Sequence, residues 1–187
     1  MSPLTPPVTA ADHVDGPDTA PLTLLEYGDY ECPYCGMAYL ILKATRRALG
    51  SQLRFVFRNF PLGQIHLHAK QAAQAAEAAA AQGKFWEMHD ALFENQNALE
   101  EADLLRYAKM LGLDTERVAR ELEAKTYVKR VRDDFRSGVR SGANKTPSFF
   151  INGERYDGPW EDVDAFTRVL RDAADQASRH APVTAEA

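Results

Sequence analysis

The sequence predicts a mixed α/β fold in which a β-α-β unit is followed by a helical block and then by the order α-β-β-α. Three observations support this fold. Apolar runs at 22–27 and 53–58 enclose a segment with helical spacing. The segment between residue 60 and residue 147 shows no strand pattern. Two short runs then flank Asn152-Gly153, a dipeptide typical of hairpin turns.

The first unit occupies residues 22–58. A mostly apolar run at 22–27 is typical of a buried strand. Pro33 can begin a helix and Gly50 can end it. Alternation of apolar and basic residues over 53–58 predicts the second strand, which ends before Pro61. The spacing of Met37, Leu40, Ile41, Ala44 and Ala48 is helical and predicts the helix between the two strands.

The remaining elements follow from similar patterns. Asp114 can cap a helix, with Leu113 and Val118 placed as a hydrophobic staple. Strands are expected at 148–151 and 154–156. Helical spacing is further found at 69–81, 85–93 and 102–111, in the stripe Val128, Val131, Phe135 and Val139, and in a closing helix with Val163, Phe166, Leu170 and Ala173.

These elements divide the chain into parts. Residues 21–62 and 126–176 form the α/β domain, and residues 63–125 form an inserted all-helical domain. Residues 1–20 are rich in proline and predict an irregular N-terminal arm. Residues 177–187 predict a flexible tail.

Composition narrows the class of protein. The chain has 187 residues, with 22 Lys and Arg against 27 Asp and Glu, so its net charge is −5. An acidic balance argues against nucleic acid as a partner. No apolar run approaches the ~20 residues of a membrane span. The N-terminus lacks the pattern of a signal peptide, so a cytoplasmic location is expected, or a periplasmic one if a signal peptide has been removed.

The two cysteines carry the strongest functional signal. Cys32 and Cys35 lie in Cys32-Pro33-Tyr34-Cys35, between the first strand and the first helix. A helix N-terminus favours the thiolate, which is the nucleophile of disulfide exchange. Cys32 is then expected to be the exposed attacking sulfur, and Cys35, one turn inward, the resolving one. No cofactor is needed, because the sulfur pair carries the electrons.

Other interpretations of the pair are weaker. Two cysteines can be inert core residues, or half of a metal site. A second cysteine pair is absent from the sequence and the five histidines are scattered, so no metal site is expected. A C-x-x-C pair at a strand–helix junction of a β-α-β unit favours redox chemistry.

Thr146-Pro147 precedes the strand at 148–151. A proline there is compatible with an edge position. A cis proline beside the sulfurs would instead turn neighbouring backbone groups toward a bound peptide.

Four segments of the sequence match a known family: Glu26-Tyr27-Gly28-Asp29-Tyr30-Glu31-Cys32-Pro33-Tyr34-Cys35-Gly36, Phe57-Arg58-Asn59-Phe60-Pro61-Leu62, Lys84-Phe85-Trp86-Glu87-Met88-His89 and Thr146-Pro147-Ser148-Phe149-Phe150-Ile151-Asn152-Gly153. Through these segments, residues 13–172 resemble the DsbA-like branch of the thioredoxin superfamily. The resemblance implies a thioredoxin fold with an inserted helical domain, a cis Pro147 and dithiol–disulfide oxidoreductase activity. It also implies that Glu26 lies beneath the cysteines and relays a proton for the resolving thiol.

The residues around the cysteine pair indicate that the protein is a less strong oxidant than the most oxidising DsbA enzymes. Strongly oxidising DsbA enzymes carry His where Tyr34 stands, and Cys-Pro-Tyr-Cys is usual in glutaredoxins. Asp29 and Glu31 place negative charge near Cys32, which is expected to raise its pKa.

Three of the histidines are expected to have structural roles. His66 and His68 are expected in a cap or surface role, and His89 in a packing role.

The sequence therefore predicts a thiol–disulfide oxidoreductase acting on protein or peptide thiols and disulfides, through a mixed disulfide at Cys32. Pro33, Tyr34, Thr146 and Pro147 are expected to bind substrate, and an unidentified redox partner is expected to recycle the pair. Two alternatives remain: a glutathione-linked enzyme of the glutaredoxin or transferase kind, and a non-enzymatic redox sensor or chaperone.

Overall fold

The computed structural model of the protein describes residues 3–180 and contains a five-stranded sheet of order β1-β3-β2-β4-β5. The pair β2–β3 is parallel, and the other three pairs are antiparallel. The strands are β1 (His13–Asp15), β2 (Leu22–Gly28), β3 (Leu53–Asn59), β4 (Ser148–Ile151) and β5 (Glu154–Tyr156).

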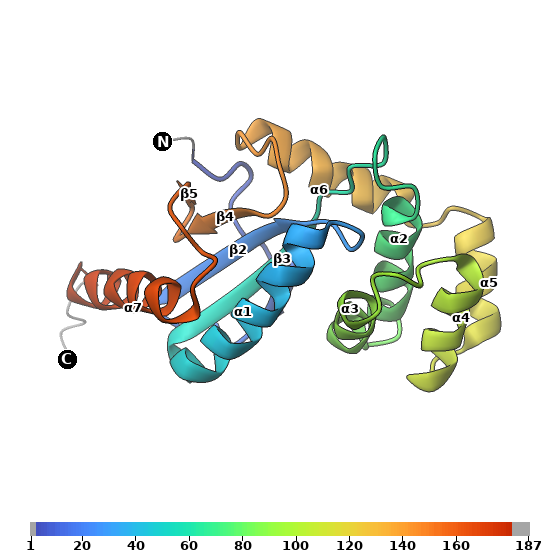
Figure 1. Ribbon diagram of the computed structural model, residues 1–187, viewed down its shortest axis with the longest axis horizontal. Helices are drawn as coiled ribbons and strands as arrows, with labels where there is room; N and C mark the ends of the chain where they lie inside the picture. Colours follow the sequence, from blue (N-terminus) through green and yellow to red (C-terminus); the bar gives the residue numbers. More distant parts are fainter. Residues whose placement is uncertain (1–2, 181–187) are drawn as a thin grey trace, which may run out of the picture.

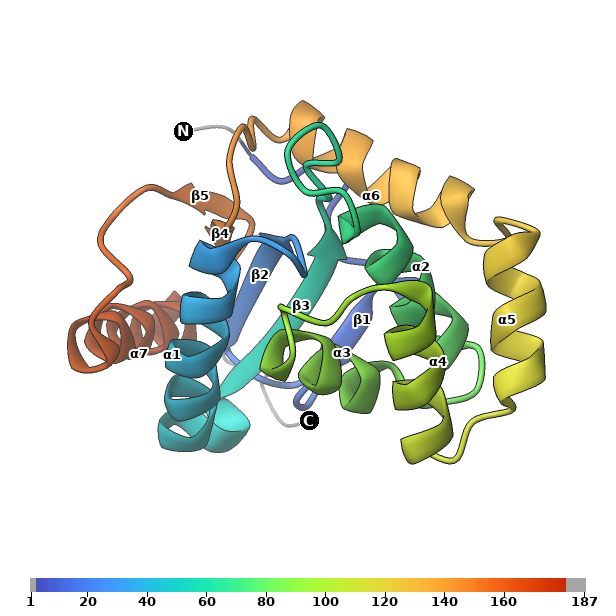
Figure 2. The same cartoon turned by 45° about the vertical axis from the view of Figure 1, so that its right-hand side comes forward.

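Helices cover both faces of this sheet (Figures 1 and 2). On one face, α1 (Pro33–Leu49) packs against α7 (Val163–His180). On the other, α6 (Val128–Arg140) packs against β3. Alternate residues of β2 enter two separate apolar clusters, with Leu24 in one and Leu25 in the other. The central strand is therefore buried on both sides, as a parallel strand between helical layers requires.

The segment between β3 and α6 is helical. It contains α2 (Ala69–Ala80), α3 (Phe85–Glu94), α4 (Glu101–Met110) and α5 (Thr115–Glu123). Helix α2 is buried on most of its circumference because it packs against its three neighbours and α6. Its alanine side chains allow these helices to approach closely. The cap predicted at Asp114 is present, since its carboxylate accepts the Arg117 N–H at 2.9 Å.

The structure differs from the sequence prediction at both ends. Residues 13–15 of the predicted irregular arm form β1, and Pro3 forms a bridge with Glu154. The arm is held by the buried guanidinium of Arg58, which donates to the Asp12 carboxylate at 2.7 and 3.0 Å and to the carbonyls of Pro6 and Pro7 at 3.0 Å. Helix α7 continues to His180, so a tail beginning at 177 is wrong; residues 181–187 lie outside the described residues.

None of the helices within residues 3–180 has both the length and the apolar character needed to cross a membrane.

Candidate active site

The two cysteines lie where β2 passes into α1. Cys32 occupies the N-cap position with extended backbone, and Pro33 is the first helical residue. Proline fits there because its missing N–H would be unpaired in any case. Cys35 lies one turn further on, and both thiols are free. The Cys32 sulfur therefore faces the unpaired N–H groups of the first turn, which favour negative charge.

Both sulfur-bearing residues are buried. Cys32 is 4% exposed and Cys35 is fully covered. The expectation of an exposed Cys32 is therefore wrong. The carbonyl oxygen of Thr146, which lies 3.6 Å from the Cys32 sulfur, contributes to its cover. The neighbouring Tyr34 is 63% exposed, so the site still borders solvent.

The two thiols have opposite acid–base properties. Hydrogen bonding from the Cys35 thiol lowers the pKa of Cys32 to about 5, although burial opposes this effect. The Thr146 side chain and the backbone N–H groups of Tyr34 and Cys35 lower it further. Burial raises the pKa of Cys35 well above its ordinary value. At neutral pH the pair therefore contains one thiolate and one thiol.

Glu26 lies on β2 and is 1% exposed. Burial, together with the negative charge of Cys32, raises its pKa to about 8. Its carboxyl also interacts with the Cys35 thiol, which partly offsets the rise. The Oε1 atom has no hydrogen-bond partner. A carboxyl with this pKa exchanges its proton near neutrality, which is what a proton relay requires.

The loop between α6 and β4 lies against Cys32. The Thr146–Pro147 peptide bond is cis. Both residues are buried, and the Thr146 hydroxyl has no hydrogen-bond partner while the Cys32 thiol points to the Thr146 carbonyl. The hydroxyl is therefore available to donate to the Cys32 thiolate once the thiol proton has left.

Asp29 is held by the segment that joins β3 to α2. It is buried and accepts hydrogen bonds from the Leu62 N–H at 2.7 Å and the Glu31 N–H at 2.9 Å, and it pairs with His66 Nδ1 at 2.7 Å. The Asp29 N–H lies 3.4 Å from the Cys35 sulfur and donates to it.

Glu31 makes a similar connection to α2. It pairs with His68 Nδ1 at 2.9 Å and accepts the N–H groups of His68 and Ala69 at 2.6 and 3.0 Å. Glu31 thus caps α2, whereas His68 occupies the N-cap position without capping it through its side chain.

The two acidic residues near Cys32 are held in pairs with histidines. Asp29 pairs with His66 and Glu31 with His68, and the main influences on the pKa of Cys32 are Cys35, burial and Thr146. The pKa of about 5 lies above the value of about 3.5 for the strongly oxidising DsbA, in agreement with the expectation of a less acidic Cys32.

Gln96 is a site residue that the sequence analysis missed. Its amide donates to the carbonyls of Tyr30 and Cys32 at 2.9 Å each, so the loop after α3 holds the catalytic loop. A side chain at Gly36 would collide with the Gln96 amide. No motif marks Gln96, because its role depends on the docking of the helical block.

His89 has the packing role that the sequence predicted. It is 2% exposed, stands edge-on to Phe57 and Phe93, and pairs through Nδ1 with the Tyr30 hydroxyl at 3.2 Å. In the part of the chain that the structure describes, no three His, Cys, Asp or Glu side chains converge on a position that could hold a metal ion.

Comparison with known proteins shows the family and the fold of the chain. Residues 9–172 match the family model described as thioredoxin. A solved thioredoxin-like oxidoreductase from Silicibacter pomeroyi DSS-3 is 31% identical, with a TM-score of 0.77 over 92% of this chain and 95% of that chain. Oxidised BdbD from Bacillus subtilis shares the fold at 23% identity, with a TM-score of 0.80 over 93% and 96% of the two chains.

The curated proteins that resemble the chain include a Na⁺/H⁺ antiporter. The Na⁺/H⁺ antiporter NhaA 1 of Mycobacterium sp. (strain KMS) is 46% identical over 152 residues, which cover 80% of this chain and 25% of the antiporter. The chain therefore corresponds to about a quarter of that much longer protein.

Proposed function

Because the chain belongs to the thioredoxin family, we propose that it is a DsbA-like enzyme that exchanges thiols and disulfides with protein or peptide substrates through Cys32 and Cys35. The observation that carries this proposal is the asymmetry of the pair: a Cys32 thiol with a pKa of about 5 beside a buried Cys35 whose pKa is raised. Only the first is a nucleophile at neutral pH.

In the reducing direction, the Cys32 thiolate attacks one sulfur of a substrate disulfide. A mixed disulfide forms at Cys32, and the other substrate sulfur leaves as a thiolate. Ionised Glu26 takes the Cys35 proton, and the Cys35 thiolate attacks the Cys32 sulfur. This step forms the Cys32–Cys35 disulfide and releases the second substrate thiolate, so the substrate gains the two electrons that the pair loses.

In the oxidising direction, a substrate thiolate attacks the Cys32 sulfur of the disulfide. Cys35 leaves and receives a proton from Glu26, which is largely protonated at neutral pH because its pKa is about 8. A second substrate thiolate then attacks the substrate sulfur of the mixed disulfide and displaces Cys32. A thiolate with a pKa of about 5 is a good leaving group, so the surroundings of Cys32 favour this direction.

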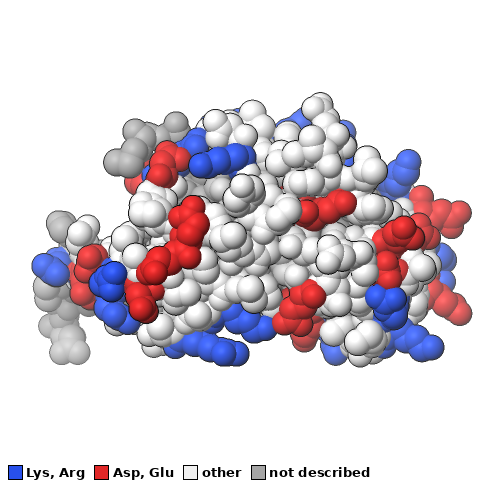
Figure 3. All heavy atoms as spheres, viewed as in Figure 1, with Lys and Arg blue, Asp and Glu red and all other residues white. Residues whose placement is uncertain are grey.

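The surface beside the cysteines suits an apolar polypeptide. Tyr34, Met37 and Leu40 share one face of α1 and are 63%, 45% and 65% exposed. Uncharged side chains occupy most of the centre of the face that contains α1 (Figure 3). Together with Pro33, Thr146 and Pro147, these residues provide the proposed substrate surface, and apolar exposure of this kind marks binding sites.

A trapping experiment tests the proposal. Cys35→Ser leaves the nucleophile but removes the resolving thiol, so with intact insulin, whose chains are joined by disulfides, it should accumulate a mixed disulfide visible by mass spectrometry. Cys32→Ser should give none, and wild type should give only a transient one. Equal trapping by both variants would reject the assigned roles. Glutathione disulfide as the sole substrate tests the glutaredoxin-like alternative, which would require a faster reaction with glutathione disulfide than with the protein disulfide.

The antiporter relative supports a second candidate function, in which the substrate is a Na⁺/H⁺ antiporter. Reduced chain would be added to membrane vesicles that contain the full-length antiporter of Mycobacterium sp. (strain KMS). Sodium-dependent proton exchange should change with wild type and remain constant with Cys32→Ser. An unchanged rate in both cases would reject this candidate.

A further inference from the structure

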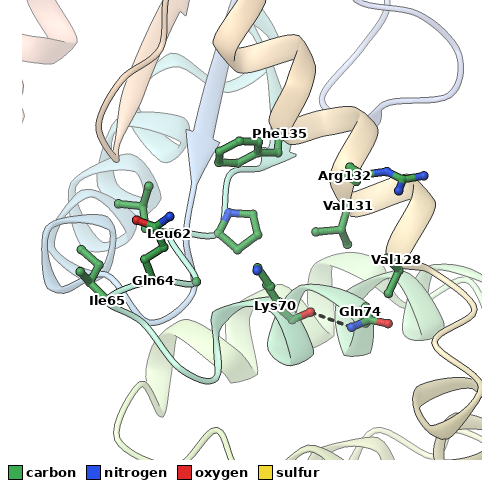
Figure 4. Close-up of a pocket in the computed structure, with 11 residues that line it drawn as sticks. Leu62, Gln64, Ile65, Lys70, Gln74, Val128, Val131, Arg132 and Phe135 are labelled. Atoms are coloured by element: carbon green, nitrogen blue, oxygen red, sulfur yellow. Dashed lines mark hydrogen bonds between the residues drawn. The ribbon is translucent and has the colours of Figure 1, made fainter.

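A second site lies away from the cysteines, between the segment after β3 and the helices α2 and α6. It is a pocket of about 560 Å³, which falls within the range of small-molecule sites, about 300–1,000 Å³. Its lining includes neither cysteine and neither Thr146 nor Pro147. Figure 4 shows the side chains of α2 and α6 facing each other across it.

The walls of the pocket are mostly apolar. Helix α6 contributes Val128, Val131 and Phe135, and the opposite wall contains Leu62 and Ile65 (Figure 4). Ile65 is 71% exposed, so part of this wall is open to solvent. An apolar surface of this kind favours a ligand with an apolar body.

Two polar groups from α2 interrupt these walls. The Lys70 ammonium points toward the apolar side chains (Figure 4), and within residues 3–180 it has no carboxylate partner. Gln74, one turn further along α2, is 9% exposed. Its Nε2 donates to the Lys70 carbonyl at 3.1 Å, whereas its Oε1 is buried without a partner. The pocket therefore presents one unpaired cation, the exposed Lys70 ammonium, whereas Gln74 Oε1 is enclosed by the protein and is not open to the pocket.

We propose that this pocket binds a small carboxylic acid with an apolar body. The carboxylate pairs with the Lys70 ammonium, which points toward the apolar side chains (Figure 4). The apolar body packs on Val131 and Phe135. Arg132 lies at the rim and adds positive charge that attracts an anion.

The pocket adjoins the catalytic loop through one of its own residues. The Leu62 N–H donates to Asp29, and the Asp29 N–H donates to the Cys35 sulfur. The ligand nevertheless binds independently of the redox reaction, because none of the atoms assigned to it belongs to that reaction.

Calorimetric titration with N-acetyl-L-phenylalanine tests the proposal, because this compound carries a carboxylate and an apolar ring. Its methyl ester removes the charge and keeps the ring. The ester should bind at least about tenfold more weakly, as expected for loss of a hydrogen bond to a charged group.

Protein variants test whether the ligand binds in this pocket. Lys70→Gln should weaken binding of the acid at least about tenfold and leave binding of the ester unchanged. Lys109→Gln, which removes an exposed lysine of α4, is the matched control and should bind like wild type. Methyl NMR should show ligand-induced shifts at Val128, Val131 and Ile65. Cys32→Ser should bind normally, which separates this proposal from the redox function.

Three outcomes would overturn the proposal: no heat of binding with the acid, equal affinity for acid and ester, or shifts confined to methyl groups outside the pocket. If the acid does not bind but Val128→Trp slows reaction with a peptide disulfide, the pocket holds substrate polypeptide and the proposal is wrong.

Discussion

The Cys32 sulfur lies 3.6 Å from the carbonyl oxygen of Thr146, the residue before the cis Pro147. The Thr146 side chain also lowers the pKa of Cys32. The loop that covers the nucleophile therefore contributes to its acidity.

Replacing Thr146 by Val tests this contribution. The valine has a similar shape but cannot donate to the thiolate, so the pKa of Cys32 should rise by about one unit. Thiolate absorbance at 240 nm, followed against pH, measures the shift. Thr146→Ser keeps a hydroxyl and should restore most of the acidity. An unchanged pKa in Thr146→Val would contradict the role of the hydroxyl.

The second prediction concerns the pH dependence of stability in the reduced protein. Between pH 5 and about 8.5, folded Cys32 has lost a proton that the unfolded chain keeps, so its contribution to stability rises with pH. Between about 4.5 and 8, folded Glu26 keeps a proton that the unfolded chain loses, so its contribution falls with pH. The two contributions oppose each other from pH 5 to pH 8.

Glu26→Gln should remove the falling contribution. Urea unfolding of the reduced variant should show stability rising, relative to wild type, by up to about 1.4 kcal/mol per pH unit over this range. Cys32→Ser should shift the dependence in the opposite direction. Parallel pH profiles for wild type and Glu26→Gln would show that Glu26 titrates normally.

The two carboxylate–histidine pairs should differ in their effect on stability. The Asp29 side chain is fully buried, whereas that of Glu31 is 22% exposed. His66→Phe leaves a buried carboxylate with one partner fewer and should lower the free energy of unfolding by about 2 kcal/mol. His68→Phe should cost less than about 1 kcal/mol. Denaturant unfolding measures both, and equal losses would contradict the difference in burial.

Gly36 and Gln96 should be energetically coupled. Gly36→Ala places a methyl group against the Gln96 amide, and Gln96→Ala removes the hydrogen bonds to the Tyr30 and Cys32 carbonyls. In the double variant the new methyl group no longer meets the Gln96 amide. Its free energy of unfolding should therefore exceed the value predicted by adding the two single losses, by about 1 kcal/mol. Additive losses in a double-mutant cycle would show that the amide moves away freely.

The sequence predicted the elements that have their own periodicity. The strands at 22–28 and 53–59, the hairpin at Asn152-Gly153 and the helix that begins at Pro33 all follow from local patterns. The positions of the two cysteines at the start of that helix follow from the same patterns, because a C-x-x-C pair between a strand and a helix must lie at the helix N-terminus.

The remaining features depend on contacts between distant segments. Strand β1 has three residues, too few for a pattern, and forms by pairing with β3. The pairing of Asp29 with His66 and the reach of Gln96 to Cys32 depend on how the helical block docks. The sequence therefore indicated the charges of Asp29 and Glu31 near Cys32 but not the histidines with which they pair.

The most direct test of the account is the pH dependence of alkylation of each thiol in the reduced protein. Iodoacetamide modification, assigned to each cysteine by mass spectrometry, should affect Cys32 alone below pH 8, with a midpoint near pH 5. Equal modification of Cys35, or a Cys32 midpoint near the value of about 8.5 for a free thiol, would contradict the assignment of Cys32 as nucleophile and Cys35 as resolving thiol.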